Sequence, residues 1–378
     1  MWSLKGTEAS MWRGVLFAGA VLSLTAAPTA LRAAPDPAGF IFVSSAVDPD
    51  IAVIDSASDT VVTRIKLPGA PRHVVALGRG KELVASDAAA PKLYVVDAVG
   101  GTVTRVVETG VAPVLLQLDR AGTVLAVADP DAGAVEFVRP AGGPTTRISG
   151  IKGMRSMVFV ADGRLLVAHG SRIGLVDPAD GRMVAELPVD GRDGPVLQIA
   201  ADPGGGTAFA VQGDKGVLSV FDLKTLTRAP RLRLPPPVGR MLPSADSQFM
   251  LIPVAGGRAL SIVSTWTLKE SARIPMSAEV SGLGLGLFQS VSIGMSRETR
   301  SVQTVDLRDR RRFAPLALPG VPEAGAASPD GLKFYVALSD TGQVAVVDLR
   351  HSTVSHVIPD AVRGASNAVP AVGIGYCH

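Results

Sequence analysis

Short apolar runs, most of them ending in an acidic residue, recur along the chain. The clearest copies are IAVID (51–55), LYVVD (93–97), IGLVD (173–177), LSVFD (218–222), VQTVD (302–306) and VAVVD (344–348). Two weaker copies, AVEFVR (134–139) and ALSIVS (259–264), fill the gaps between them. Runs this short, rich in Val, Leu and Ile and bounded by turn residues, predict β-strands rather than helices.

The copies are evenly spaced. With Arg139 and Ser264 as the aligned positions of the weak copies, the steps are 42, 42, 38, 45, 42, 42 and 42 residues. A repeat of about 40 residues holding about four short strands is typical of a β-propeller blade. The sequence therefore predicts an all-β, eight-bladed propeller of four-stranded antiparallel blades. Seven blades, with one weak copy outside the ring, is the alternative.

The two ends of the repeat array complement each other. In the last full repeat, the strands lettered a to d from the axis outwards are EAGAAS, LKFYVAL, QVAVVDL and TVSHVIP. The first repeat begins with GFIFVSSA (39–46), which aligns with a b strand, whereas 368–375 aligns with the a strands. We expect 368–375 to complete blade one, since closure of the ring removes free sheet edges. This makes 35–378 a single propeller domain.

Two long stretches resemble a known repeat. FVSSAVDPDIAVIDSASDTVVTRIKLPGAPRHVVAL (42–77) and FYVALSDTGQVAVVDLRHSTVSHVIP (334–359) are similar to the YVTN-type propeller repeat of exported bacterial proteins. The resemblance extends over nearly all of 35–378 and implies the fold. Propellers of this kind include ligand-binding proteins, quinoprotein-like amine dehydrogenase chains, lactonases and eight-bladed cytochrome d1-like (haem d1) domains. No local motif matches one of these groups, so the resemblance assigns no catalytic residue.

The amino terminus has the pattern of an export signal. Arg13 precedes an apolar run over 14–27, and small residues at 30–34 offer cleavage points of the A-x-A kind. We therefore expect a cleaved signal peptide at 1–34 and a periplasmic or secreted mature protein. The run is too short to predict a membrane span, and none is expected in the mature protein.

Charge and motifs exclude several functions. Lys5, Arg13 and Arg32 against Glu8 account for +2 of the net charge of +3, which leaves the mature chain near +1 and gives no support to nucleic-acid binding. The single Cys excludes an internal disulfide, and the absence of C-x-x-C-H excludes covalent haem. No P-loop, G-x-S-x-G or H-E-x-x-H motif is present. No motif in the sequence requires a cofactor, and the sequence does not identify one.

Topology sorts the remaining polar residues. Strands alternate in direction, so the starts of the a strands and the b–c turns lie on one face, which we call the a-start face. Polar residues here rim the axial opening, where they would bind a small anionic or mixed-charge ligand. These candidates are Arg72, His73, Arg155, Arg240, Glu279, Glu323 and Asn367. Alternatively, they are loop residues kept polar by water; His73 could be a general base, a haem or metal ligand, or a turn residue.

Two further features, a run of alternating glycines and a carboxyl-terminal Cys–His pair, each allow two interpretations. Gly282, Gly284 and Gly286 alternate along the inner strand of blade seven and reflect either close packing or a pocket walled by blades seven, eight and one. At the carboxyl terminus, Cys377 and His378 form a candidate metal site; the alternative is a free thiol at a partly buried terminus.

These observations favour an exported, monomeric, non-catalytic propeller that binds a small ligand or a periplasmic partner protein at its axial face. The second hypothesis is a cofactor-handling or redox propeller of the haem d1 or quinoprotein type, with His73 as axial ligand. The third is a propeller lactonase, which needs a cluster of acidic, His and Arg groups or a metal at the axis.

Overall fold

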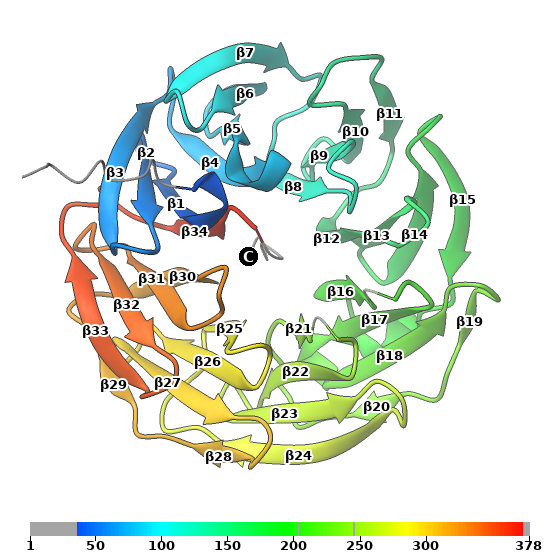
Figure 1. The fold of residues 1–378 in the computed structure, drawn as a ribbon. Coiled ribbons are helices and arrows are strands. Elements are labelled where there is room, and N and C mark those ends of the chain that lie inside the picture. Colours follow the sequence, from blue (N-terminus) through cyan, green and yellow to red (C-terminus); the bar gives the residue numbers. More distant parts are fainter. Residues whose placement is uncertain (1–35, 203, 245, 373–378) are drawn as a thin grey trace, which may run out of the picture. The chain divides into compact units, whose positions relative to one another are not determined.

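Eight β-sheets surround a central axis in the computed structural model, which describes residues 36–202, 204–244 and 246–372 (Figure 1). Each sheet is one antiparallel blade of four strands, and in blades five and seven the outer strand is split into two short pieces. The prediction of an all-β, eight-bladed propeller is confirmed, and the seven-bladed alternative is wrong. Both weak repeats, 134–139 and 259–264, form full c strands.

The first four blades have the following strands. Blade one contains β1 (Phe40–Ser45), β2 (Asp48–Asp55), β3 (Thr60–Lys66) and β34 (Asn367–Pro370). Blade two contains β4 (Pro71–Leu77), β5 (Glu82–Asp87), β6 (Lys92–Asp97) and β7 (Thr102–Glu108). Blade three contains β8 (Leu115–Leu118), β9 (Leu125–Asp129), β10 (Ala134–Val138) and β11 (Thr146–Ser149). Blade four contains β12 (Met154–Phe159), β13 (Leu165–His169), β14 (Arg172–Asp177) and β15 (Arg182–Leu187).

The other four blades continue around the axis. Blade five contains β16 (Gln198–Ala201), β17 (Thr207–Gln212), β18 (Val217–Asp222), β19 (Thr227–Arg228) and β20 (Leu232–Arg233). Blade six contains β21 (Leu242–Pro243), β22 (Phe249–Val254), β23 (Ala259–Ser264) and β24 (Lys269–Pro275). Blade seven contains β25 (Gly282–Gly286), β26 (Val291–Ser296), β27 (Ser301–Asp306), β28 (Arg311–Arg312) and β29 (Leu316–Ala317). Blade eight contains β30 (Pro322–Ala327), β31 (Lys333–Leu338), β32 (Val344–Asp348) and β33 (Thr353–Ile358).

Helical structure in the described residues is limited to short 3₁₀ turns. They are η1 (Pro37–Gly39), η2 (Gly78–Gly80), η3 (Gly191–Asp193) and η4 (Gly213–Lys215). None of the described helices is long and apolar enough to cross a membrane.

Blade one joins the two ends of the described chain. Its strand order is β3-β2-β1-β34, and β34 pairs with β1 antiparallel from Asn367 opposite Ser44 to Pro370 opposite Ile41. The backbone N–H of Ala371 adds a 2.8 Å hydrogen bond to the Phe40 carbonyl. Ring closure is thus confirmed. Of the predicted strand 368–375, residues 368–370 belong to β34, the chain bends at 371–372, and 373–375 lie outside the described residues.

The recurring acidic residue at the end of the c strand has a local structural role. In blade two, Asp97 Oδ1 accepts hydrogen bonds from the backbone N–H groups of Val99 (2.9 Å) and Gly100 (3.0 Å). Gly101 then takes a φ of 67°, a conformation that costs glycine little. The same capping by the c-strand aspartate recurs at Asp55, Asp177, Asp222, Asp306 and Asp348. The repeat pattern therefore marks the c–d turn.

Close packing between blades seven and eight explains the alternating glycines. A Cβ on Gly284 would lie 2.2 Å from Cζ of Phe334, and one on Gly325 would lie 2.2 Å from Cε1 of the same ring. A Cβ on Gly286 would meet Leu349 at 2.2 Å. These glycines make room for buried side chains of blade eight. Of the three predicted positions, only Gly282 lines a described cavity.

Replacement of Gly284 by Ala tests this packing. We expect a loss of about 1–3 kcal/mol in the free energy of unfolding, because the added methyl overlaps the fully buried Phe334 ring. Adding Phe334→Leu should recover part of the loss. Gly206→Ala is the matched control, since its Cβ would meet no atom within 4 Å. Chemical denaturation checks all three variants, and a Gly284→Ala protein as stable as the wild type would contradict the packing.

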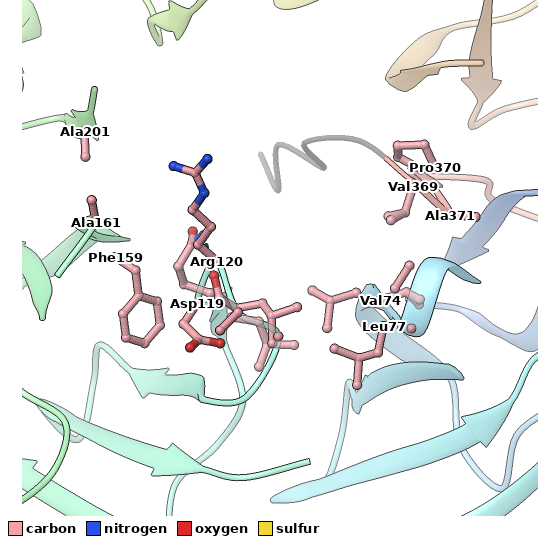
Figure 2. Close-up of a pocket in the computed structure, with 18 of the residues that line it drawn as sticks. Val74, Leu77, Asp119, Arg120, Phe159, Ala161, Ala201, Val369, Pro370 and Ala371 are labelled. Atoms are coloured by element: carbon pink, nitrogen blue, oxygen red, sulfur yellow. Dashed lines mark hydrogen bonds between the residues drawn. The ribbon is translucent and has the colours of Figure 1, made fainter. Parts of the chain in front are cut away.

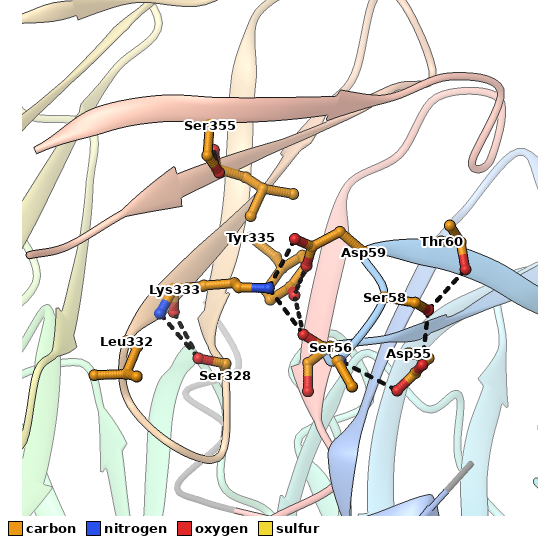
Figure 3. A network of polar contacts seen from close by, with 12 residues as sticks. Asp55, Ser56, Ser58, Asp59, Thr60, Ser328, Leu332, Lys333, Tyr335 and Ser355 are labelled. Carbon is orange, nitrogen blue, oxygen red and sulfur yellow. Dashed lines mark hydrogen bonds and ion pairs between the residues drawn. The ribbon is translucent and has the colours of Figure 1, made fainter. Parts of the chain in front are cut away.

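A polar network crosses the seam between blades eight and one (Figure 3). Nζ of Lys333 lies 2.7 Å from Oδ2 of Asp59 and 3.0 Å from the Ser56 carbonyl oxygen. The hydroxyl of Tyr335 donates to Asp59, and the Tyr335 side chain is fully buried. Burial raises the pKa of Tyr335, and the Asp59 carboxylate raises it further. In blade two, burial and a hydrogen bond to Asp87 raise the pKa of Tyr94 to about 12.

These two tyrosines predict a loss of stability at high pH. Both keep their proton in the folded state, whereas in the unfolded chain a tyrosine ionises near pH 10.0. Their contribution is therefore complete below pH 10 and declines as the pH rises towards about 12. We expect the free energy of unfolding to fall more steeply over this range in the wild type than in the Tyr94→Phe/Tyr335→Phe double variant. Equal slopes in urea titrations would contradict the prediction.

Candidate functional site

A cavity of about 460 Å³ opens around the axis on the a-start face. Its wall is built from the inner strands β34, β8, β12, β16, β21, β25 and β30, which belong to every blade except blade two. The first residues of the a strands and the b–c turns alternate around the opening of this cavity. Side chains from different repeats therefore converge on one space. The cavity is preformed by the ring.

Charged and amide side chains at this cavity come from six blades. They are Gln117, Gln198, Arg240, Arg297, Glu323 and Asn367. Arg240, which lies before β21, is exposed and has no hydrogen bond or ion pair within the described residues. Arg297 forms an ion pair with Glu323 that bridges blades seven and eight. The charges at the cavity wall thus comprise one available cation and one cation–anion pair.

The structure brings together three of the predicted site residues. Arg240, Glu323 and Asn367 line the axial cavity. The other four candidates lie elsewhere on the a-start face and do not line it: Arg72, His73, Arg155 and Glu279. Glu279 instead borders a much smaller recess between the segment that leads into β25 and the strands β26 and β27 of blade seven.

Three of the charged and amide lining residues, Gln117, Gln198 and Arg297, were not among the predicted site residues. Arg297 lies in the b–c turn of blade seven, between β26 and β27, and the same topological rule that selected the a-strand starts applies to it. Gln117 is the third residue of β8, and Gln198 is the first residue of β16. The rule that selected the strand starts therefore applies to Gln198 as well, whereas no sequence signal singles out Gln117.

His73 acts as a link between blades two and three. Its Nε2 lies 2.9 Å from the carbonyl oxygen of Val114, and its backbone N–H donates to Oγ of Ser86 at 3.0 Å. Burial lowers the pKa of His73, with a smaller contribution in the same direction from neighbouring Arg72. A neutral ring that donates through Nε2 satisfies both the burial and the Val114 carbonyl.

Similar links recur around the inner strands. Nδ2 of Asn367 donates to the Arg72 carbonyl at 2.8 Å, from blade one to blade two. The hydroxyl of Ser156 accepts from the N–H of Ile199 at 3.2 Å, from blade four to blade five. The amide of Gln198 donates to the Met241 carbonyl at 3.1 Å and accepts from the Met241 N–H, from blade five to blade six. Much of the polar rim therefore holds blades together.

A second cavity, of about 600 Å³, opens on the opposite side of the ring, which carries the a–b and c–d turns and which we call the a–b face (Figure 2). Its wall is mainly apolar and includes Leu77, Phe159 and Val369. Arg120 extends from the β8–β9 turn into the open space of the cavity, whereas the Asp119 side chain points the other way (Figure 2). The Asp119 carboxylate is bonded to its own turn, through the N–H groups of Thr123 (2.6 Å) and Val124 (2.9 Å).

Metal-binding groups are sparse in the described part of the chain. Within 36–202, 204–244 and 246–372, no cluster of three His, Cys, Asp or Glu side chains could hold a metal ion. The predicted Cys377–His378 site lies outside these residues. The aspartates of the b–c turns mostly cap their own turns; Asp129, for example, accepts from the N–H groups of Asp131 and Ala132.

Comparison with known proteins adds information on the fold. No protein-family model matches the sequence, and no curated protein matches it. Dihydro-heme d1 dehydrogenase NirN, solved in complex with DHE, matches 92% of this chain and 78% of its own length with a TM-score of 0.70 and 14% identity. Kuenenia stuttgartiensis hydrazine synthase matches 75% of this chain and 96% of its own, with a TM-score of 0.56 and 17% identity. The chain shares the propeller fold with both.

These likenesses agree with the expected propeller fold. At such identities they show the fold alone. The YVTN repeat type stays a prediction from the sequence, as do the signal peptide and the periplasmic location.

The inter-blade role of His73 predicts an acid-sensitive stability. Because the folded state lowers the pKa of His73, the unfolded chain takes up the proton first as the pH falls below about 6.5, and stability declines from there. His73→Gln keeps an amide donor for the Val114 carbonyl but does not titrate. Between pH 7 and 5, the wild type should lose more stability than this variant in urea denaturation. Identical pH profiles would show that His73 does not couple protonation to folding.

Proposed function

We propose that this protein is a binding propeller whose axial cavity on the a-start face holds a small organic anion. The observation that carries the proposal is Arg240, an exposed guanidinium without a partner among the described residues, at the wall of a preformed cavity. A guanidinium offers a planar fork of donors that matches a carboxylate. The Arg297–Glu323 pair adds a second guanidinium within the same wall.

The rest of the cavity suits a ligand with an apolar body. Met241, Leu242, Val280 and Leu283 contribute aliphatic surface beside the charged groups. Binding sites for small molecules commonly combine such a wall with a few placed polar groups. The Arg297–Glu323 pair can also accept a ligand of mixed charge, since Glu323 presents a carboxylate to an ammonium or hydroxyl group.

Binding without chemistry is the form of the proposal that fits these side chains. The hydroxyl of Ser281, a lining residue, donates to the Met295 carbonyl at 3.1 Å. Ser156 is likewise engaged with Ile199 across the blade interface. Neither hydroxyl faces a histidine or carboxylate base in the described residues, so neither has the partner that nucleophilic catalysis requires.

A tetrapyrrole with carboxylate substituents is a second candidate ligand. The likeness to NirN over 92% of the chain favours it, since that protein is named as a dihydro-heme d1 dehydrogenase. In this chain no described histidine lines the axial cavity, and Nε2 of His73 is engaged with Val114. We therefore propose that Arg240 and Arg297 would hold such a ligand by its carboxylates.

The sequence predicts the cellular location of this binding activity. The export signal predicted at 1–34 would place the propeller in the periplasm or outside the cell, as a monomer with its axial face open to ligands or to a partner protein. A rigid ring suits this role because a preformed cavity loses little conformational entropy on binding.

A titration with two probes tests the proposal. Protoporphyrin IX, a tetrapyrrole dicarboxylate, is followed by absorbance, and citrate, a small tricarboxylate, by calorimetry. We expect one of them to bind at a single site, and Arg240→Ser to weaken that binding about tenfold, since a hydrogen bond to a charged group contributes about 1.5–3 kcal/mol.

Arg155→Ser is the matched control, because Arg155 is exposed on the same face but does not line the cavity. Its affinity should equal that of the wild type. Binding of porphyrin alone favours the tetrapyrrole class, and binding of citrate alone favours a small polycarboxylate. Failure of both probes, or equal losses in the two arginine variants, would contradict the proposed site.

A further inference from the structure

Two large apolar side chains are exposed at turn tips on the a–b face, away from the axial cavity described above. Trp266, in the c–d turn between β23 and β24, is 83% exposed, and Phe288, in the a–b turn between β25 and β26, is 78% exposed. The turns belong to blades six and seven, which are neighbours in the ring (Figure 1). Both strand connections lie at the same end of their blades, so both aromatic tips face the same way.

The turn that carries Phe288 holds a costly backbone conformation. Leu287, Phe288 and Gln289 have φ values of 46°, 52° and 68°, and none of them is glycine. Such residues are disfavoured in left-handed conformations, each at a cost in free energy. The turn is nevertheless well fixed: the Leu287 N–H donates to the Gly331 carbonyl at 2.6 Å, and the Ser290 hydroxyl donates to the Leu287 carbonyl at 2.6 Å. The fold therefore holds the backbone of the turn in place and presents Phe288 at its tip.

Exposed arginines lie on the same face, in the c–d turns of blades seven and eight. The c–d turn of blade seven has the sequence LRDRRR (307–312), and its arginines are all exposed. Within the described residues, the guanidinium groups of Arg308 and Arg310 have no hydrogen bond or ion pair. The nearby Asp306 carboxylate accepts from the backbone N–H groups of Arg308 (2.9 Å) and Asp309 (3.1 Å) instead. Arg350, in the c–d turn of blade eight, is also exposed and has no side-chain partner in the described chain.

We infer that this sector of the a–b face, defined by Trp266, Phe288, Arg308, Arg310 and Arg350, docks on an anionic lipid surface. Trp and Phe side chains are favoured at the boundary between headgroups and acyl chains. Unpaired arginines gain from the negative potential of anionic headgroups. The separate turn tips favour a soft, laterally uniform surface over a protein, which would require a matching pocket for each ring.

This inference is independent of the proposed ligand. It concerns the opposite face and uses none of the cavity residues. Docking of this kind, through side chains at turn tips, would be peripheral and reversible.

Sedimentation with lipid vesicles tests the inference on the full mature chain. One vesicle preparation contains equal parts phosphatidylglycerol and phosphatidylcholine, and the other contains phosphatidylcholine alone. We expect the protein to sediment with the anionic vesicles only. Arg308→Glu/Arg310→Glu should lower the apparent affinity at least tenfold, since each basic residue at an anionic surface contributes roughly fivefold. Trp266→Ser/Phe288→Ser should also weaken binding.

The matched control is Arg72→Glu/Arg155→Glu, which makes the same change in net charge on the a-start face. It should bind the anionic vesicles like the wild type, and thermal melting verifies that each variant is folded. No binding to anionic vesicles would overturn the inference and leave an acidic protein as the occupant. Equal losses in the two charge-reversed variants would also overturn it, because they would show attraction by net charge rather than by this sector.

Discussion

The pairing of β34 with β1 is the interaction on which the rest of the structure depends. Each blade packs only against its two neighbours, so the ring exists only if the first and last blades meet. Blade one is built from both ends of the described chain, and four backbone pairs, from Asn367–Ser44 to Pro370–Ile41, complete its inner edge. Farther from the axis, at the seam between blades eight and one, Lys333 and Tyr335 of blade eight bind Asp59 of blade one. Backbone pairing near the axis and ionic contacts farther out therefore both stabilise the closed ring.

Closure also explains why polar residues concentrate around the axis and why only some are available to a ligand. The inner strands have one edge towards the axial space, and a buried donor or acceptor there needs a partner. His73, Ser156, Gln198 and Asn367 meet this need through the backbone of the next blade. Arg240 does not. A polar residue of the rim thus becomes a candidate for binding only after its inter-blade bond has been considered.

The fold could be predicted from the sequence because its signals are local. An aspartate that caps the c–d turn recurs in six blades with nearly constant spacing, and the weaker copies at 134–139 and 259–264 bring the count to eight blades. The site could be predicted only in part. Topology placed Arg240, Glu323 and Asn367 on the face that holds the axial cavity, and the same rule applies to Arg297. Spacing cannot show that residue 73 meets residue 114, because this depends on the rotation between blades. Nor can it show that Gly284 makes room for Phe334, a contact between strands about 50 residues apart.

The two faces of the ring carry different chemistry, and this has a consequence for how the proposals combine. The a-start face holds the axial cavity with Arg240. The a–b face has the exposed Trp266 and Phe288, and arginines without a side-chain partner in the described residues. Strand direction fixes this separation, since a-strand starts and a–b turns lie at opposite ends of each blade. If the a–b face contacts lipid, the axial cavity on the a-start face points away from the lipid and stays open to the surrounding solution. A propeller attached in this way would keep the ligand in its axial cavity accessible to a second protein while its a–b face is bound to lipid.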